Sequence, residues 1–176
     1  MKIKVRPEDF IVQEMVNIPI KKKGGFSVFT LRKRGWNTVD VIKKISRTFS
    51  IPLTDFSYGG KKDRYAVTKQ YITIRDTSPI LEKKVNRMDE NYSLNFAGFT
   101  DRPMGPDLIE GNRFEIAVRD LTDRDLQSAL GEIDRVNKDG YPNYFDDQRF
   151  GSLDPTQGFI AEKILKGHYN GALKIY

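Results

Sequence analysis

The chain has 176 residues, with 30 Lys and Arg against 24 Asp and Glu, a net charge of +6, one His and no Cys. This length predicts one domain or most of one, and an apolar content of 38% is sufficient to build a hydrophobic core. Without Cys there are no disulfides, thiolate zinc sites or thiol nucleophiles, and the single His168 excludes sites that need two imidazoles. Any chemistry must therefore use carboxylates, amines, guanidinium groups, hydroxyls and amides.

The sequence has no run of the roughly 20 apolar residues that a membrane helix needs, and its first ten residues lack the apolar core of a signal peptide. We therefore expect a soluble cytoplasmic protein with no membrane partner.

The basic residues are concentrated in the first part of the chain. Residues 1–70 contain 16 basic and 6 acidic side chains, a charge of +10, whereas residues 71–176 contain 14 and 18, a charge of −4. The basic side chains occur in clusters at residues 21–23, 32–34, 43–44 and 61–62. Two interpretations fit these clusters, a surface that binds a polyanion and a surface that merely keeps the protein in solution.

The hydrophobic pattern changes between strand and helix periods along the chain. The first strand is expected within residues 2–16, after Pro7, with Phe10, Val12 and Glu14 on one face. Further strands are predicted at residues 26–34, 56–58, 66–75, 92–99 and 113–119, and helices at residues 38–49, 122–140 and 156–166. Single helices among several strands favour an α+β fold with a mixed, mainly antiparallel sheet and flanking helices over a doubly wound parallel sheet.

The segment Gly59-Gly60-Lys61-Lys62-Asp63-Arg64 has the most unusual local chemistry. Neighbouring cations favour the ionised form of the Asp63 carboxylate, which can then act as a nucleophile or base. The same cations would reduce its repulsion of nucleic-acid phosphates. A charged turn without catalytic function is the alternative. The segment is not a phosphate-binding P-loop, because Lys62 stands where that motif needs Ser or Thr.

Four sequence blocks, read together, resemble the TruD family of tRNA pseudouridine synthases. They occur in the family's order within residues 4–151: Lys4-x-x-Pro7-x-Asp9-Phe10-x-Val12-x-Glu14, Gly60-x-Lys62-Asp63-x-x-Ala66-x-Thr68-x-Gln70, Gly111-Asn112-Arg113-Phe114, and Pro142-Asn143-Tyr144-Phe145-x-x-Gln148-Arg149-Phe150-Gly151. Each block is weak or moderate alone, and the four in register are highly specific. The resemblance implies the pseudouridine synthase catalytic fold, in a form that is incomplete in this chain.

The resemblance also implies roles for individual residues. Asp63 would be the catalytic aspartate, Phe114 the aromatic that stacks on the target uracil, and Asn112 a residue that orients the aspartate. The remaining matched residues would form the walls of the site or support it: Lys4, Phe10, Glu14, Lys62, Thr68, Gln70, Gln148, Arg149 and Phe150.

The implied reaction suits this composition. Conversion of uridine to pseudouridine exchanges the bond from N1 to C1′ for one from C5 to C1′ and needs neither metal nor cofactor. The carboxylate would attack C1′, add to the base or remove the C2′ proton, and the sequence does not distinguish these routes. The partner would be tRNA, with uridine 13 of the D arm as the family's usual target.

Other interpretations remain open at this stage. Phe10, Phe114 and Phe150 fit a core as well as a base-stacking role, Asn112 fits a turn, and Arg149 fits a structural ion pair. The whole chain fits an RNA-binding module without activity. Asp146, Asp147 and Asp154 fit a metal-dependent phosphodiesterase less well, because their spacing is unspecific.

The chain departs from the family in two respects. Asp146 stands where the family usually has Gly, and only about 25 residues follow Gly151. We therefore expect residues 1–151 to be part of the catalytic domain and residues 152–176 to begin the family's inserted domain. This division predicts a fragment, a truncated form or one part of a split protein, with the missing C-terminal part as its partner and with an exposed sheet edge.

Overall fold

The computed structural model describes residues 1–75, 90–141, 153–154 and 158–173. The chain divides into two compact units, Met1–Arg124 and Asp125–Tyr176. The boundary predicted after residue 151 lies outside the described residues and stays a prediction.

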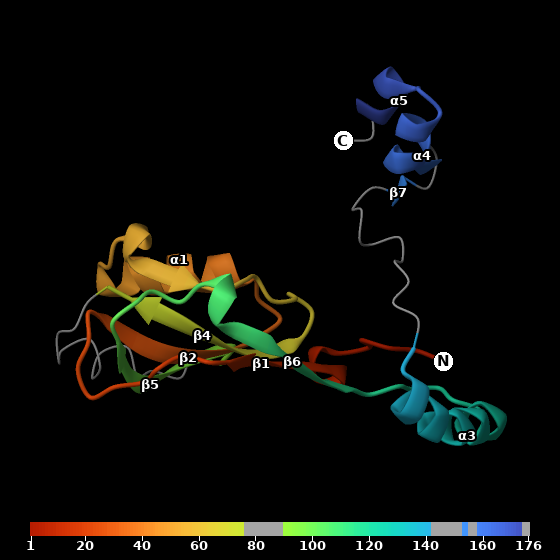
Figure 1. The fold of residues 1–176 in the computed structure, drawn as a ribbon, viewed down its shortest axis with the longest axis horizontal. Coiled ribbons are helices and arrows are strands. Elements are labelled where there is room, and N and C mark those ends of the chain that lie inside the picture. Colours follow the sequence, from red (N-terminus) through yellow and green to blue (C-terminus); the bar gives the residue numbers. More distant parts are fainter. Residues whose placement is uncertain (76–89, 142–152, 155–157, 174–176) are drawn as a thin grey trace. The chain divides into compact units, whose positions relative to one another are not determined.

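The first unit is built on one six-stranded sheet (Figure 1). Its strands are β1 (Phe10–Val16), β2 (Phe26–Arg34), β3 (Phe56–Tyr58), β4 (Val67–Ile74), β5 (Tyr92–Thr100) and β6 (Ile109–Ile116). Their order is β5-β2-β4-β1-β6, and β3 pairs with β4. The pair β1–β4 is parallel and the other pairs are antiparallel. The expected α+β fold with a mixed, mainly antiparallel sheet is therefore confirmed, and β6 lies at one edge of the described sheet.

Two strands, β1 and β3, pair with the same edge of strand β4. Its first half, Val67–Lys69, pairs with β1, and its second half, Ile72–Ile74, pairs with β3. The segment 59–66 leaves β3 beside the second half of β4 and enters β4 at its first half. This topology brings the glycine-rich segment next to β1, although the two are about 50 residues apart in the sequence.

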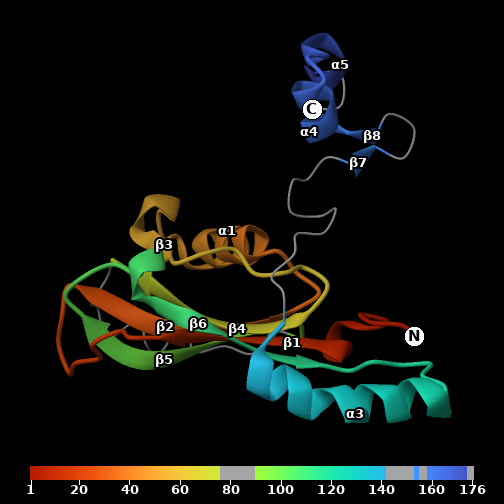
Figure 2. The same cartoon turned by 45° about the vertical axis from the view of Figure 1, so that its right-hand side comes forward.

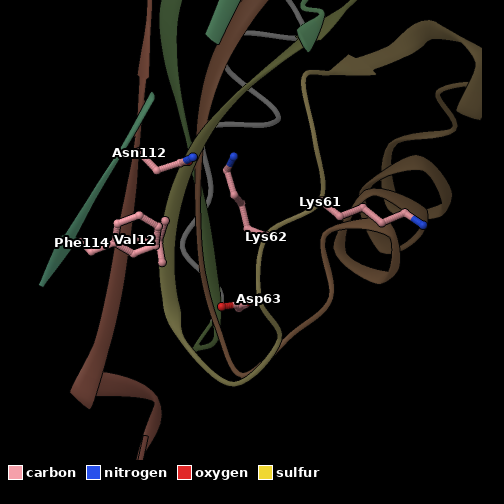
Figure 3. Close-up of a pocket in the computed structure, with 6 residues that line it drawn as sticks. All are labelled: Val12, Lys61, Lys62, Asp63, Asn112 and Phe114. Carbon is pink, nitrogen blue, oxygen red and sulfur yellow. The ribbon is translucent and has the colours of Figure 1, made fainter. Parts of the chain in front are cut away.

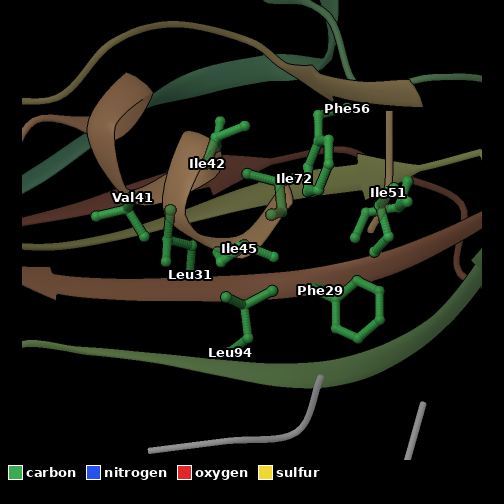
Figure 4. Packing of buried hydrophobic residues seen from close by; sticks show 10 residues of the cluster. Phe29, Leu31, Val41, Ile42, Ile45, Ile51, Phe56, Ile72 and Leu94 are labelled. Carbon is green, nitrogen blue, oxygen red and sulfur yellow. The ribbon is translucent and has the colours of Figure 1, made fainter. Parts of the chain in front are cut away.

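Helix α1 (Thr38–Phe49) lies across one face of the sheet (Figures 1 and 2). It ends at Ser50, which has a left-handed φ of 56°, just before Pro52. Between helix and sheet lies a core of ten buried side chains (Figure 4): Phe29, Leu31, Val41, Ile42, Ile45, Ile51, Phe56, Ile72, Ile74 and Leu94. Alternation within β2 and β4 directs these side chains toward α1, and the opposite face carries exposed Arg32 and Lys69.

Most predicted elements agree with the structure to within two residues, and the exceptions are β6 and the helix predicted at residues 156–166. Strand β6 is predicted at residues 113–119, whereas it runs from Ile109 to Ile116. Gly111 and Asn112 suit a turn, yet they pair with Met15 and Glu14 within the β1–β6 ladder. Long-range pairing with β1 therefore overrides their low strand propensity.

Three helices, the first of them 17 residues long, and a two-stranded ribbon follow in the described residues. Helix α3 (Asp123–Asp139) spans the boundary between units and ends before Gly140, which has a φ of 74°. Strands β7 (Leu153–Asp154) and β8 (Gly158–Phe159) pair with each other, and helices α4 (Ile160–Leu165) and α5 (Tyr169–Leu173) follow. Helix α4 is shorter than the predicted helix 156–166 because Gly158 and Phe159 form a strand. None of the helices in these described ranges is long and apolar enough to cross a bilayer.

Candidate active site

A small open hollow of about 180 Å³ lies on the α1 side of the sheet, between the segment 59–66 and strands β1 and β6 (Figure 3). It is lined by residues from three parts of the chain: Val12, Lys61, Lys62, Asp63, Asn112 and Phe114. Four of the twelve residues that the resemblance assigns to the site therefore line one hollow, namely Lys62, Asp63, Asn112 and Phe114.

Asp63 presents its carboxylate at this hollow and is held by Lys4. The Asp63 side chain is about half exposed, and its Oδ2 lies 3.3 Å from Lys4 Nζ. The same Nζ lies 3.9 Å from the centre of the Phe10 ring. Lys4 thus connects the predicted catalytic carboxylate to the predicted aromatic wall. Its own backbone has a φ of 54°, in the left-handed region that non-glycine residues seldom occupy and that recurs at functional sites.

The β1–β6 ladder forms the aromatic wall. Phe114 is opposite Val12 and Ile116 is opposite Phe10, so these side chains share the face that borders the hollow. The rings of Phe10 and Phe114 lie 5.9 Å apart at 56°. Phe114 is 54% exposed, which contradicts a core role for this residue. An exposed aromatic beside a carboxylate suits the stacking of a base that has left its helix.

Asn112 is opposite Glu14 in the same ladder and lines the hollow. Among the hydrogen bonds of the described residues, none joins Asn112 to Asp63, so its orienting role stays a prediction. The alternative turn role is wrong, because Asn112 lies within β6.

Glu14 and Lys62 form a buried ion pair beneath the hollow. Glu14 Oε1 lies 2.7 Å from Lys62 Nζ, and the two side chains are 0% and 9% exposed. The backbone N–H of Tyr71 donates to the other carboxylate oxygen of Glu14 at 2.9 Å. This pair ties the segment that carries Asp63 to β1.

Polar side chains from α1 and β4 also hold this segment. Gln70 Nε2 donates to the carbonyl of Gly60 at 3.0 Å. The Thr38 hydroxyl donates to Gln70 Oε1 at 2.8 Å and accepts the backbone N–H of Lys62 at 3.1 Å. Gln70 therefore holds the backbone of the segment, and its role in the site stays a prediction. The sequence predicted only that a helix begins at Thr38. The hydroxyl group at this first helical position was the one local signal that Thr38 contacts residues outside the helix.

Lys33 also contacts the segment, although the sequence indicated only a surface cluster for it. Its Nζ donates to the carbonyls of Lys62 and Asp63 at 3.2 and 2.7 Å. Strand alternation was the missed signal, because Lys33 follows buried Phe29 and Leu31 at a spacing of two.

The first block also contains a residue that stabilises the fold outside the hollow. Asp9 is 1% exposed and accepts two hydrogen bonds from the Arg119 guanidinium, at 2.8 and 2.6 Å. These hydrogen bonds lower the pKa of Asp9 to about 2. Asp9 therefore links the residue just before β1 to Arg119, which follows β6 in the sequence.

The remaining candidates lie elsewhere. Arg149, Gln148 and Phe150 are outside the described residues, as are Asp146 and Asp147. In the part of the chain that the structure describes, no three acidic or imidazole side chains gather as a metal site requires. His168 is exposed after α4.

Comparison with known proteins agrees with the motifs and the geometry. The family model described as tRNA pseudouridine synthase D (TruD) matches residues 1–176. The tRNA pseudouridine synthase D of Aquifex aeolicus (strain VF5) is 38% identical over 180 residues, covering 100% of this chain and 46% of that protein. The protein of the same name from Leptospira interrogans is 35% identical over 174 residues, covering 98% and 42%.

A solved structure shows the same fold. The crystal structure of a Methanosarcina mazei protein assigned as tRNA pseudouridine synthase D matches with a TM-score of 0.81 at 29% identity, covering 97% of this chain and 39% of that one. The chain thus spans less than half the length of these relatives. From its motifs, its fold and the match over all 176 residues, the chain belongs to the TruD family of tRNA pseudouridine synthases.

Proposed function

We propose that the protein isomerises uridine to pseudouridine in tRNA, with Asp63 as the catalytic carboxylate and uridine 13 of the D arm as the target. The observation that carries this proposal is the pairing of Asp63 with exposed Phe114 across one hollow. Family membership and the names of the relatives support the reaction class. The cytoplasmic location stays a prediction.

The proposed reaction begins with a flipped uridine whose base stacks on Phe114 and whose ribose faces Asp63. The bond from N1 to C1′ breaks, the base turns, and C5 bonds to C1′. C5 then loses its proton and N1 gains one, so the atoms balance without an oxidant or reductant. The ionised Asp63 would attack C1′, add to the base or remove the C2′ proton.

The surrounding cations have a separate role in this proposal. Lys4 forms an ion pair with the Asp63 carboxylate in the absence of substrate. Lys61 and Arg64, which lie on the same segment as Asp63, are exposed near the site. These charges would offset the repulsion between a carboxylate and RNA phosphates. The basic clusters at residues 21–23 and 43–44 would add contacts to the RNA backbone.

The test compares Asp63→Asn with wild type in the natural protein that contains this chain. We expect no tritium release from tRNA labelled at C5 of uridine, while tRNA affinity stays within a few fold of wild type. Turnover by Asp63→Asn would contradict the role of Asp63. A wild-type protein that binds tRNA with a steep salt dependence but forms no pseudouridine would instead support the RNA-binding module.

A further inference from the structure

Lys33, at the end of β2, is a fully buried lysine beneath the segment that carries Asp63. It is 0% exposed and ranks among the largest side chains that are completely enclosed in the described residues. Burial of an ammonium group is costly unless acceptors replace water. The carbonyls of Asp63 and Lys62, at 2.7 and 3.2 Å from Nζ, are such acceptors. The cation is therefore held by the backbone of the catalytic segment itself.

The contacts of Lys33 differ in kind from those of the other supports. Gln70 and Thr38 bind the segment at Gly60 and at the N–H of Lys62, before the aspartate. Lys4 binds the exposed carboxylate, a group that a substrate also needs to reach. Lys33 binds the carbonyl of Asp63 from the interior of the protein, so a bound substrate does not compete with this contact.

Burial and two neighbouring charges together set the pKa of Lys33. Burial lowers the pKa of Lys33 to about 8, the nearby Asp63 charge opposes this shift, and the Lys62 charge adds to it. In the sheet, Lys33 pairs with Thr68 of β4 on one side and with Tyr92 of β5 on the other. Among these neighbours Asp63 is the one that favours the protonated amine.

We propose that Lys33 is a positioning residue for the isomerisation. Its buried ammonium holds the backbone of Asp63 in place, and this backbone orients the Asp63 carboxylate toward the flipped uridine. This proposal rests on the catalytic role proposed for Asp63. A misplacement of about 1 Å at a reacting group can cost on the order of 100-fold in rate. Loss of the Lys33 ammonium should therefore slow the chemical step and leave RNA binding nearly unchanged, because Lys33 is inaccessible to RNA.

The test uses Lys33→Met in the natural protein that contains this chain, since methionine replaces the lysine stem without the charge. We expect the single-turnover rate to fall about 100-fold, with tRNA affinity within about threefold of wild type and an unchanged circular dichroism spectrum. The matched control is Lys69→Met, which removes an exposed lysine from β4 on the opposite face. Its rate at saturating protein should equal that of wild type.

A second variant keeps the proposal testable if Lys33→Met fails to fold. The 176 residues contain no Cys, so Lys33→Cys introduces one thiol into them. Alkylation of the unfolded Lys33→Cys protein with 2-bromoethylamine, followed by refolding, restores an ammonium at nearly the original length. Iodoacetamide gives a neutral side chain at the same position. Recovery of the rate with the amine and not with the amide would support positioning by the charge.

The outcomes separate two kinds of failure. Equal single-turnover rates for wild type and folded Lys33→Met, or equal rates for the two alkylated forms, would overturn the role of Lys33 alone. A wild-type protein that forms no pseudouridine would contradict the proposed function of the site.

Discussion

Lys4 Nζ lies between the Asp63 carboxylate and the Phe10 ring, 3.3 Å from Oδ2 and 3.9 Å from the ring centre. An ion pair this exposed contributes little to stability. Its position beside a carboxylate that lines the hollow indicates a role in the chemistry. The contact joins residues 59 positions apart, and it depends on the parallel pairing of β1 with β4.

The first prediction concerns this contact. Lys4→Met should lower the rate of pseudouridine formation about tenfold, because the negative charge that develops on the departing uracil loses a nearby cation. It should leave the unfolding free energy within about 0.5 kcal/mol. Lys2→Met is the matched control, since Lys2 pairs with Asp120 at the surface. Single-turnover assays at saturating protein measure the effect. Equal rates for Lys4→Met and Lys2→Met would contradict it.

The second prediction separates stacking from packing at Phe114. Because Phe114 is 54% exposed, Phe114→Ala should change the midpoint of thermal unfolding very little. It should nevertheless slow pseudouridine formation about 5- to 150-fold, since base stacking on an aromatic side chain contributes about 1–3 kcal/mol. Phe114→Tyr, which keeps the ring, should retain most of the rate. A large loss of stability in Phe114→Ala would show that the ring serves the fold.

How far the sequence determined this site can be judged from three features: the inner face of β1, the burial of Lys33 and the pairing of Glu14 with Lys62. Period-two alternation placed Phe10, Val12 and Glu14 on one face, and the β1–β6 ladder confirms that they share it. The same rule applied to β2 would have placed Lys33 inward with Leu31, but the flanking Arg32 and Arg34 suggested a solvated cluster. The pairing of Glu14 with Lys62 depends on which strands become neighbours, and local pattern does not contain that information.

The third prediction concerns the buried pair. Glu14→Leu removes the carboxylate that pairs with the buried Lys62 side chain, so it should lower the unfolding free energy by about 3 kcal/mol. The double variant Glu14→Leu/Lys62→Met should recover most of this loss, because no uncompensated charge stays buried. Urea unfolding measures both. Glu115→Leu, at an exposed position of β6, is the control and should change the free energy by less than about 0.5 kcal/mol.

The fourth prediction is a dependence of stability on pH. The Arg119 hydrogen bonds lower the pKa of Asp9 from an ordinary value of 3.8 to about 2, so the folded state binds this proton more weakly than the unfolded state. The stabilisation by Asp9 is therefore complete above about pH 5 and disappears as the pH falls to about 2. Asp9→Asn should lower the thermal midpoint at pH 7, and the difference from wild type should shrink below pH 4.

A surface carboxylate provides the control for this experiment. Asp107 pairs with Arg102 where both side chains are more than half exposed. Asp107→Asn should therefore give nearly the wild-type thermal midpoint at every pH. A difference between wild type and Asp9→Asn that stays constant from pH 7 to pH 2 would contradict the assignment to Asp9.

The fifth prediction concerns two cations on the face of the sheet opposite α1. Arg32 and Lys69 are direct partners in the antiparallel β2–β4 ladder, and both are exposed. Like charges in this position repel, so Lys69→Glu should raise the unfolding free energy by about 0.5 kcal/mol. Lys69→Gln should give a smaller gain, because it removes the repulsion without adding attraction. In an Arg32→Ala background the gain from Lys69→Glu should vanish, and at high salt it should decrease. A gain that persists in both conditions would mean that Lys69 destabilises the sheet for a reason other than its charge.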